Sequence, residues 1–363
     1  MDHTFLGEIL AVTMFAVACV TLMAGFPVAF TLAGTALAFA FLGHFLPDIL
    51  SIFGVEVSGV VFRLDIFAAL PSRYIGVMTN EVLVAVPLFI FMGVMLERSR
   101  IAENLLETMG QLFGEIRGGL GLSVIFVGML LAASTGIVGA TVVTMGLLSL
   151  PAMMKAGYDP KVATGTICAS GTLGQIIPPS IVLVLLGDIL QGAWTEAQRA
   201  VGNWAPEPIS VVDLFVGAFI PGMMLVVMYM LWIVIQAIIN PKATPALVIS
   251  PEDKASLKYR VFKVLMPPAM LIFAVLGSIL AGIATPTEAA GVGAVGSMVL
   301  AFCYKQLDMK TLQHVMRSTL QITTMVFIIL VGASLFSLVF RGLNGEELVE
   351  QALHNMPGGP FGA

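Results

Sequence analysis

Charged residues are scarce in this chain. They make up 11% of its 363 residues, whereas roughly 25% is typical of soluble domains. Hydrophobic residues make up 58%, and apolar runs of about the ~20 residues that a membrane-spanning helix requires recur along most of the sequence. The scarcity of charge excludes an ordinary soluble domain, and the long runs disfavour a barrel of short alternating strands. We therefore expect an all-α, polytopic membrane helical bundle in contact with the lipid bilayer.

Reactive residues and nucleotide-binding motifs are also scarce. The three cysteines, Cys19, Cys168 and Cys303, each lie in an apolar run, so we expect buried packing residues and no disulfide framework. No G-x-x-x-x-G-K-[ST] string occurs, which gives no reason to expect an ATP site or another cofactor. No G-x-S-x-G string occurs, and no histidine lies within a central apolar run, so we expect no enzyme. A basic surface for nucleic acid is not visible either.

The basic residues that are present indicate an orientation. The linker at 240–263 holds five Lys/Arg and three prolines, which is typical of an exposed cytoplasmic loop. Counting crossings from this loop places 192–210 outside as an external loop, and the N-terminus on the periplasmic side. The N-terminus has no basic stretch and no small-residue cleavage site, so its first helix is expected to be retained.

Two stretches interrupt the series of apolar runs. Residues 48–79 are more mixed and contain Arg63, Asp65 and Arg73, so we expect an external interfacial insertion there. Residues 98–117 are amphipathic, with their charges on the cytoplasmic side, which is typical of an arm helix lying along the membrane. A single acid, Glu288, follows a TPT string; the pattern fits a functional intramembrane acid and a helix cap with Thr285 or Thr287 equally well.

The apolar run at 120–154 predicts a re-entrant hairpin. Its two arms are each about 14 residues, or ~21 Å of helix, which is too short to cross a ~30 Å hydrocarbon core. The small and hydroxyl residues at 134–140 would form the tip. A hairpin that enters and leaves on the cytoplasmic side also keeps the crossing count consistent.

The next run, 161–190, contains Pro178 and Pro179 in succession. Two prolines remove two backbone donors, so this helix should stop near 175 and restart after the prolines. Exposed backbone groups at such a break are tolerated where they line a cavity, and in transporters they coordinate ions and anionic groups. Together with the hairpin tip, the break offers neutral oxygens that suit an alkali cation, although water or protons would fit the same chemistry. The hydroxyls are Ser134, Thr135, Thr141, Ser170, Thr172 and Ser180, and the carbonyls lie around Gly171 and Gly174.

Four strings carry a resemblance to a known family. They are ASGTLGQIIPPSI at 169–181, AASTGIVGATVVTMGLLSLPAM at the hairpin, PLFIFMGVMLERSRIAENLLE at 87–107 and GIATPTEAAGVGA at 282–294. In this order the chain resembles the large membrane subunit of the tripartite ATP-independent periplasmic (TRAP) transporters. The GTLGxxIPPS and TPTEAA strings are specific, whereas the hairpin tip has fewer hydroxyls than many members show.

This resemblance implies an elevator-type secondary transporter of a bacterial inner membrane. Such a symporter works with a small four-helix membrane subunit and a periplasmic solute-binding protein, and it uses a sodium gradient to import organic acids such as dicarboxylates. By residue match, Ser134, Thr135, Ser170, Gly171 and Gly174 would bind sodium ions, with Thr141 beside them. Thr172, Pro178, Pro179 and Ser180 would shape the substrate side.

The resemblance also implies two inverted repeats, each with a hairpin and a broken helix. We expect scaffold helices at 1–111, a first transport repeat at 112–191, second-half scaffold helices at 211–304, and the start of a second-repeat arm and a last helix at 305–363. No second hairpin precedes the end of the sequence, so the second repeat is expected to be incomplete. A passive channel and a non-transporting membrane scaffold are the alternatives.

Overall fold

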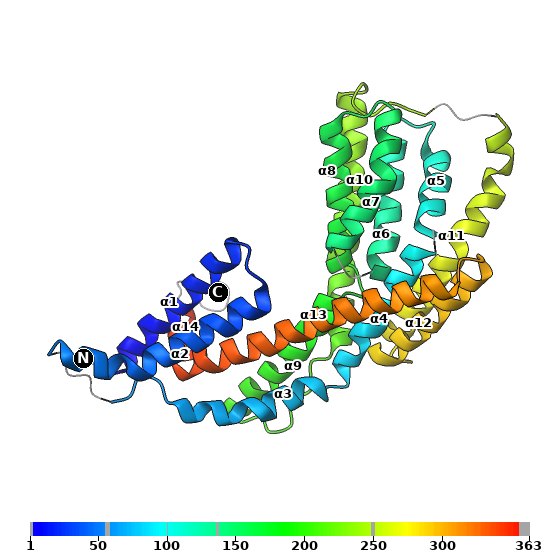
Figure 1. Cartoon of the computed structure of the whole chain (residues 1–363). Coiled ribbons are helices and arrows are strands. Elements are labelled where there is room, and N and C mark those ends of the chain that lie inside the picture. Colours follow the sequence, from blue (N-terminus) through cyan, green and yellow to red (C-terminus); the bar gives the residue numbers. More distant parts are fainter. Residues whose placement is uncertain (1–2, 55–58, 100, 136–137, 248–250, 356–363) are drawn as a thin grey trace. The chain divides into compact units, whose positions relative to one another are not determined.

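The computed structural model describes residues 3–54, 59–99, 101–135, 138–247 and 251–355. Every regular element in these ranges is a helix (Figure 1). Six helices are long and apolar enough to cross a membrane, and a seventh span results if the bent pair Leu64–Met78 and Val82–Arg98 counts as one. The six are α1 (His3–Met23), α2 (Val28–Ile52), α10 (Val211–Ile239), the part Tyr259–Leu280 of α11 (Pro251–Leu280), α12 (Pro286–Cys303) and α13 (Met309–Gly342). The predicted all-α, polytopic fold class is confirmed.

The chain divides into two compact units, of which the first comprises residues 1–80 and 324–363. It contains α1, α2, η1 (Leu64–Ala69), α3 (Leu70–Met78), the second part of α13, and α14 (Gly345–His354). Phe62 and Leu343 are fully buried at the centre of its core. Gly7 allows α1 to approach the backbone at Leu343, because a Cβ on Gly7 would lie 2.9 Å from the Leu343 carbonyl oxygen. The interfacial placement of 48–79 stays a prediction.

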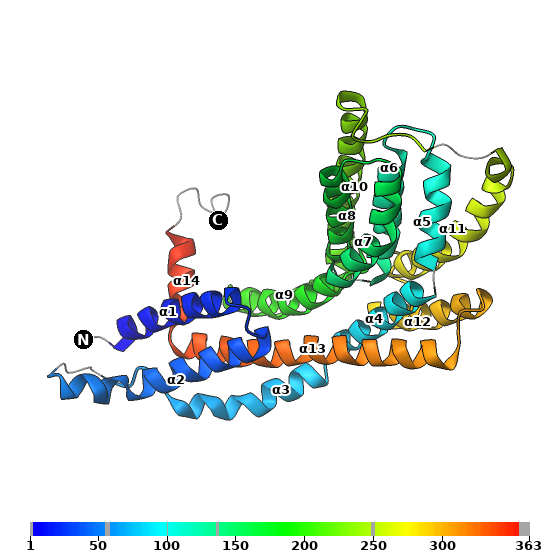
Figure 2. The same ribbon diagram turned by 45° about the horizontal axis from the view of Figure 1, so that its top comes forward.

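The second unit, residues 81–323, contains the predicted hairpin and broken helix. The hairpin consists of α6 (Gly119–Thr135) and α7 (Val138–Lys155), and the broken helix consists of α8 (Pro160–Thr172), η3 (Leu173–Gln175) and α9 (Ile181–Ala200). The unit also contains η2 (Val82–Val84), α4 (Ala85–Arg98), α5 (Ile101–Phe113), α10, α11, α12 and the first part of α13. In both ribbon views α6, α7, α8 and α10 lie side by side (Figures 1 and 2). α4 packs along α12, and α5 packs against α6 and α11.

The hairpin helices reach further toward the tip than expected. α6 has 17 residues and α7 has 18, about 25 Å of helix each, still less than a ~30 Å core. Both continue into the stretch 134–140 that was predicted to be the turn, and only 136–137 separate them. The prediction that all of 134–140 forms the turn was wrong. Without water to pair with free backbone groups, the ends of both helices keep their helical hydrogen bonds, and serine, threonine and glycine permit this.

α10 packs on the hairpin. Its Val226 and Ile233 share a buried cluster with Ile125 of α6, with Leu173 of η3 and with Ile177, which follows η3. The sequence placed this helix with the second-half scaffold, a grouping that stays a prediction. The observed packing favours one body made of the hairpin, the broken helix and α10.

The residues after α10 form hydrogen bonds to the segments that precede α6 and α8. The N–H of Gly118 donates to the carbonyl of Thr244 at 3.0 Å, and the N–H of Asp159 donates to that of Ala243 at 2.9 Å. The N–H of Leu247 donates to the carbonyl of Gly114 at 2.6 Å. This strap, residues 240–247, therefore links the residues before α6 to those before α8.

The prediction that the cysteines are buried was wrong. Cys19, Cys168 and Cys303 are all exposed on the surface of the chain. In a membrane helix the lipid-facing side is as apolar as the core, so an apolar run does not reveal which of its residues face inward.

Candidate functional site

The broken helix has a defined geometry between Thr172 and Ile181. α8 passes into the single turn η3, where the N–H groups of Ile176 and Ile177 both donate to the carbonyl of Leu173, at 3.0 and 2.9 Å. Pro178 and Pro179 follow, joined by a cis peptide bond, and α9 begins at Ile181. The prolines lack N–H groups and cannot continue the ladder, so the interruption follows from their chemistry.

Ser180 restarts the helix as its N-cap. Its hydroxyl accepts a hydrogen bond from the N–H of Leu183 at 3.4 Å and donates to the carbonyl of Gln175 at 2.8 Å. A serine at this position satisfies one of the unpaired donors of the new helix. The same side chain therefore joins the end of the first half to the start of the second half.

The hairpin holds the end of α8 at two close approaches. A Cβ on Gly128 of α6 would lie 2.6 Å from the Cβ of Ser170, and a Cβ on Gly171 would lie 2.3 Å from a methyl carbon of Val142 of α7. Both glycines are therefore required by packing, because no other residue leaves room for the backbones to approach. The hairpin and the break form one packed unit.

Backbone groups of opposite character remain unpaired at the break. In the described part of the chain, no hydrogen bond is made by the carbonyls of Gly174, Ile176 and Ile177, nor by the N–H groups of Ile181 and Val182. Free carbonyls offer ligands to a cation, and free N–H groups at a helix start offer donors to an anion. Within these described ranges no group of three or more His, Cys, Asp or Glu could hold a metal ion, so an ion at the break would be held by neutral oxygens.

The predicted cation residues fall into two sets. Ser170 and Gly171 close α8, and Gly174 lies in η3; all three are buried. Thr141 is buried in the first turn of α7, directly before the Val142 that contacts Gly171. The structure therefore brings these four residues to one place, where the hydroxyl of Ser170 donates to the carbonyl of Ile167 at 3.0 Å.

The tip residues are placed less closely. Ser134 and Thr135 end α6, and their side chains lie outside the described part. Ser170 contacts Gly128, which is six residues, or about 9 Å of helix, before Ser134. The described contacts of Ser170 with α6 are therefore at Gly128, and the assignment of Ser134 and Thr135 to a sodium site stays a prediction.

The predicted substrate residues line the other side of the break. Thr172 is exposed, and its hydroxyl donates to the carbonyl of Ala169 at 2.7 Å. Pro178, Pro179 and Ser180 are buried. Thr172 is therefore the member of this set that presents a hydroxyl at the surface of the chain, and the role of all four stays a prediction.

Sequence reasoning missed one polar contact. The hydroxyl of Thr144 in α7 donates to a carboxylate oxygen of Glu97 in α4 at 2.6 Å. Glu97 directly follows the apolar part of α4, and the principle that an acid in a membrane segment deserves a functional hypothesis could have found it. It links the hairpin to the helix packed along α12.

The alternatives for Glu288 are decided in favour of a cap. Its carboxylate accepts from the N–H and the hydroxyl of Thr285, both at 2.9 Å, while the N–H of Glu288 donates to the Thr285 hydroxyl at 3.3 Å. This reciprocal pair is a capping box. Thr287 instead donates to the carbonyl of Glu81 at 3.0 Å.

Comparison with known proteins supports the same family. Residues 15–363 match the family model described as the tripartite ATP-independent periplasmic transporter, DctM component. The chain is 30% identical over 351 residues to the C4-dicarboxylate TRAP transporter large permease protein DctM of Rhodobacter capsulatus, covering 94% of this chain and 71% of the relative. It is 31% identical over 281 residues to the protein of the same name in Pseudomonas aeruginosa, covering 77% and 60%. It is 27% identical over 277 residues to the sialic acid TRAP transporter permease protein SiaT of Haemophilus influenzae, covering 76% and 41%.

Proposed function

Because this chain belongs to the family of the DctM component of tripartite ATP-independent periplasmic transporters, we propose that it is the large membrane subunit of a secondary transporter for organic acids. A bacterial inner membrane is the expected location. The chain's helices of spanning length support a multi-pass protein. The charge of the 240–263 linker supports a cytoplasmic loop there and a periplasmic N-terminus.

The relatives support the proposed substrate class. Their names give C4-dicarboxylates, ectoine and sialic acid as cargo, so one fold serves several small solutes. Two of these names denote acids, which favours an organic acid here. The small four-helix membrane subunit and the periplasmic binding protein are proposed as partners on the strength of family membership.

The break between α8 and α9 carries the mechanistic proposal. Free carbonyls and free N–H groups occur within the same short stretch, held by the hairpin at Gly128 and Gly171. A sodium ion would bind the carbonyl side, and its charge would order the stretch. The carboxylate of the substrate would then be held by the N–H groups at the start of α9 and by the hydroxyl of Thr172.

An elevator movement fits the packing of the second unit. The hairpin, the broken helix and α10 share a core and the 240–247 strap, so they would move as one body. Their movement past α4 would break the hydrogen bond between Thr144 and Glu97. This bond would therefore help to hold one of the two end states.

Uptake by proteoliposomes tests the proposal. The large subunit is reconstituted with its small subunit and a substrate-loaded binding protein, and labelled C4-dicarboxylate uptake is measured with an inward sodium gradient or an equal potassium gradient. We expect saturable uptake with sodium only, and none when the binding protein is omitted. A proton gradient replaces sodium in a third arm, because the oxygen chemistry of the break fits both ions.

The alternative functions give different results in this assay. A passive channel would show uptake that follows the concentration gradient without a coupling ion and without saturation. A non-transporting scaffold would bind the small subunit or the binding protein and show no uptake under any gradient. Either result would overturn the transporter assignment.

A further inference from the structure

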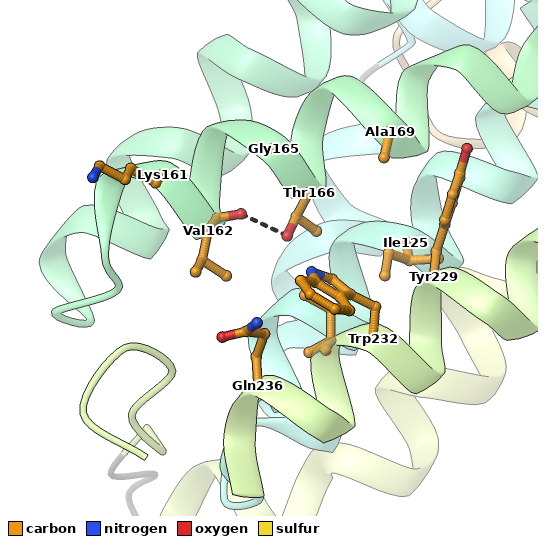
Figure 3. Close-up of a pocket in the computed structure, with 10 residues that line it drawn as sticks. Ile125, Lys161, Val162, Gly165, Thr166, Ala169, Tyr229, Trp232 and Gln236 are labelled. Atoms are coloured by element: carbon orange, nitrogen blue, oxygen red, sulfur yellow. Dashed lines mark hydrogen bonds between the residues drawn. The ribbon is translucent and has the colours of Figure 1, made fainter. Parts of the chain in front are cut away.

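The second unit, residues 81–323, has a pocket between α6, α8 and α10, on the part of α8 that precedes the break. Its volume is about 460 Å³, which is within the range of small-ligand sites. Ile125 of α6 forms a buried floor, while α8 and α10 provide the two walls (Figure 3). The pocket extends along α8 from Lys161 to Ala169, which is about 12 Å.

The wall from α8 is recessed. A Cβ placed on Gly165 would meet no atom within 4 Å, so the groove is open at this point. The hydroxyl of Thr166 does not project into it as a free group, because it donates to the carbonyl of Val162 at 2.7 Å (Figure 3). The walls are therefore smooth and largely apolar over most of their length.

Polar groups gather on this otherwise apolar surface. Lys161 extends outward from the first turn of α8, Gln236 lies in the last turn of α10, and Trp232 and Tyr229 lie one and two turns earlier in α10 (Figure 3). Within the described ranges, none of these four side chains makes a hydrogen bond or ion pair. Trp194, by contrast, donates its indole N–H to the carbonyl of Glu207 at 3.0 Å.

All four side chains can donate a hydrogen bond, and none of them is acidic. The groove is apolar, with the cation Lys161 at one end and hydrogen-bond donors beside it. This arrangement fits an amphiphile whose head group is anionic and rich in hydrogen-bond acceptors. Trp and Tyr are typical of the depth where lipid ester groups lie. A lysine at the cytoplasmic surface attracts anionic lipids.

We propose that the α6–α8–α10 pocket binds one anionic phospholipid of the cytoplasmic leaflet. Its phosphate group lies at Lys161 and Gln236, its ester groups lie beside Trp232 and Tyr229, and an acyl chain lies over Ile125 and Gly165. A dissolved organic acid fits the groove less well, because most of its lining is apolar. Because the lipid would contact both α8 and α10, it would support the packing of the body that holds the break.

Tryptophan fluorescence offers a direct test, since the chain has three tryptophans. In the full chain, Trp194→Phe and Trp204→Phe leave Trp232 as the reporter. The protein is reconstituted in vesicles with a low fraction of phosphatidylglycerol or phosphatidylcholine, brominated on the acyl chains. We expect phosphatidylglycerol to quench Trp232 with on the order of fivefold higher apparent affinity, the preference that one lysine provides near an anionic surface.

Two variants at the pocket sharpen the test. Lys161→Gln should remove the preference for phosphatidylglycerol, while Lys161→Arg should keep it. Gly165→Phe should lower quenching by both lipids, because the ring would occupy the open groove. A matched protein that retains Trp194 in place of Trp232 should show no preference, and melting in detergent checks that each variant is folded.

Three results would overturn the proposal. Equal quenching of Trp232 by the two brominated lipids would show that the pocket does not select an anionic head. A preference that survives Lys161→Gln would show that the charge acts elsewhere. Absence of quenching by both lipids would show that a protein segment covers the pocket. An excess of inorganic phosphate should leave the quenching unchanged, and its loss would indicate a soluble anion site instead.

Discussion

Two proline pairs in this chain have opposite structural consequences. Pro178 and Pro179 end one helix and precede another, with η3 and an N-cap between the two halves. Pro267 and Pro268 lie inside α11, which continues without interruption from Pro251 to Leu280. Single prolines within α2, α7 and α10 are also accommodated without a break.

The residues around each pair explain the difference. Before the first pair, Gly171 allows the backbone to approach the hairpin and Gly174 lies in the single turn η3, and afterwards Ser180 caps the new helix. The second pair has Met266 before it and Ala269 after it, neither of which offers a turn or a cap. In a membrane each unpaired backbone group is costly, so a proline pair ends a helix only where other groups satisfy or use the freed ones.

The largest predicted effect separates the two pairs by function. Replacing Pro178 and Pro179 with alanine should restore a continuous ladder, remove the free carbonyls, and reduce sodium-driven uptake to background. The same double replacement at Pro267 and Pro268 should leave uptake within about twofold, since that segment is already helical. Equal losses in the two variants would contradict the assignment of the break as the site.

A second comparison uses two glycines of α8. Gly171→Ala places a methyl group against Val142, and we expect a loss of about 1–3 kcal/mol in the free energy of unfolding from overpacking. Gly165→Ala, in the same helix but facing open space, should be neutral or slightly stabilising. Unfolding in detergent with increasing denaturant measures the stability of both variants. Equal stabilities would show that the hairpin does not pack tightly against α8 at Gly171.

The cap after the first pair should have a smaller effect. Ser180→Ala removes the acceptor for the Leu183 N–H, at a cost of about 1 kcal/mol, and hydrogen exchange of the first amides of α9 should accelerate. Ala269→Ser, which introduces a hydroxyl after the second pair, should alter neither stability nor exchange in α11. If Ser180→Ala leaves exchange in α9 unchanged, another group caps this helix.

The smallest effect concerns pH and the ends of the hairpin. Burial raises the pKa of the Tyr158 phenol above its ordinary value of 10.0, and the hydroxyl accepts from the N–H of Gly121 at 3.3 Å. Because the folded state favours the neutral phenol, the contribution of Tyr158 to the free energy of unfolding should be constant below about pH 10 and be lost as the pH rises through the folded pKa. Tyr158→Phe should flatten this fall, whereas Tyr259→Phe, at an exposed position, should not.

Much of the architecture could be predicted because a membrane-spanning helix requires a long run of apolar residues, which is visible in the sequence. The two short arms indicated the hairpin, and the prolines with their glycines and Ser180 indicated the break. The extent of the hairpin tip, the exposure of the cysteines and the packing of α10 on the hairpin could not be read in this way. Each depends on which side of an apolar helix faces protein. The side that faces lipid is as apolar as the side that faces protein, so the sequence does not distinguish them.

The candidate site was predictable in part for a related reason. Thr141, Ser170, Gly171 and Gly174 lie close together at the contact between α7 and the end of α8, while their role as cation ligands stays a prediction. The bond between Thr144 and Glu97 joins residues 47 positions apart, and only the tertiary fold brings them together. The placement of Ser170 against Gly128 likewise follows from how α8 packs against the hairpin.

Labelling of a thiol at the break tests the central claim most directly. Thr172→Cys is introduced after the three native cysteines are replaced by alanine, and reaction with a hydrophilic maleimide is followed in sodium and in potassium. Ala193→Cys, an exposed position near the far end of α9, is the matched control. The account predicts that sodium slows labelling at position 172 and leaves position 193 unchanged; equal rates at position 172 in the two salts would contradict a sodium site at the interrupted helix.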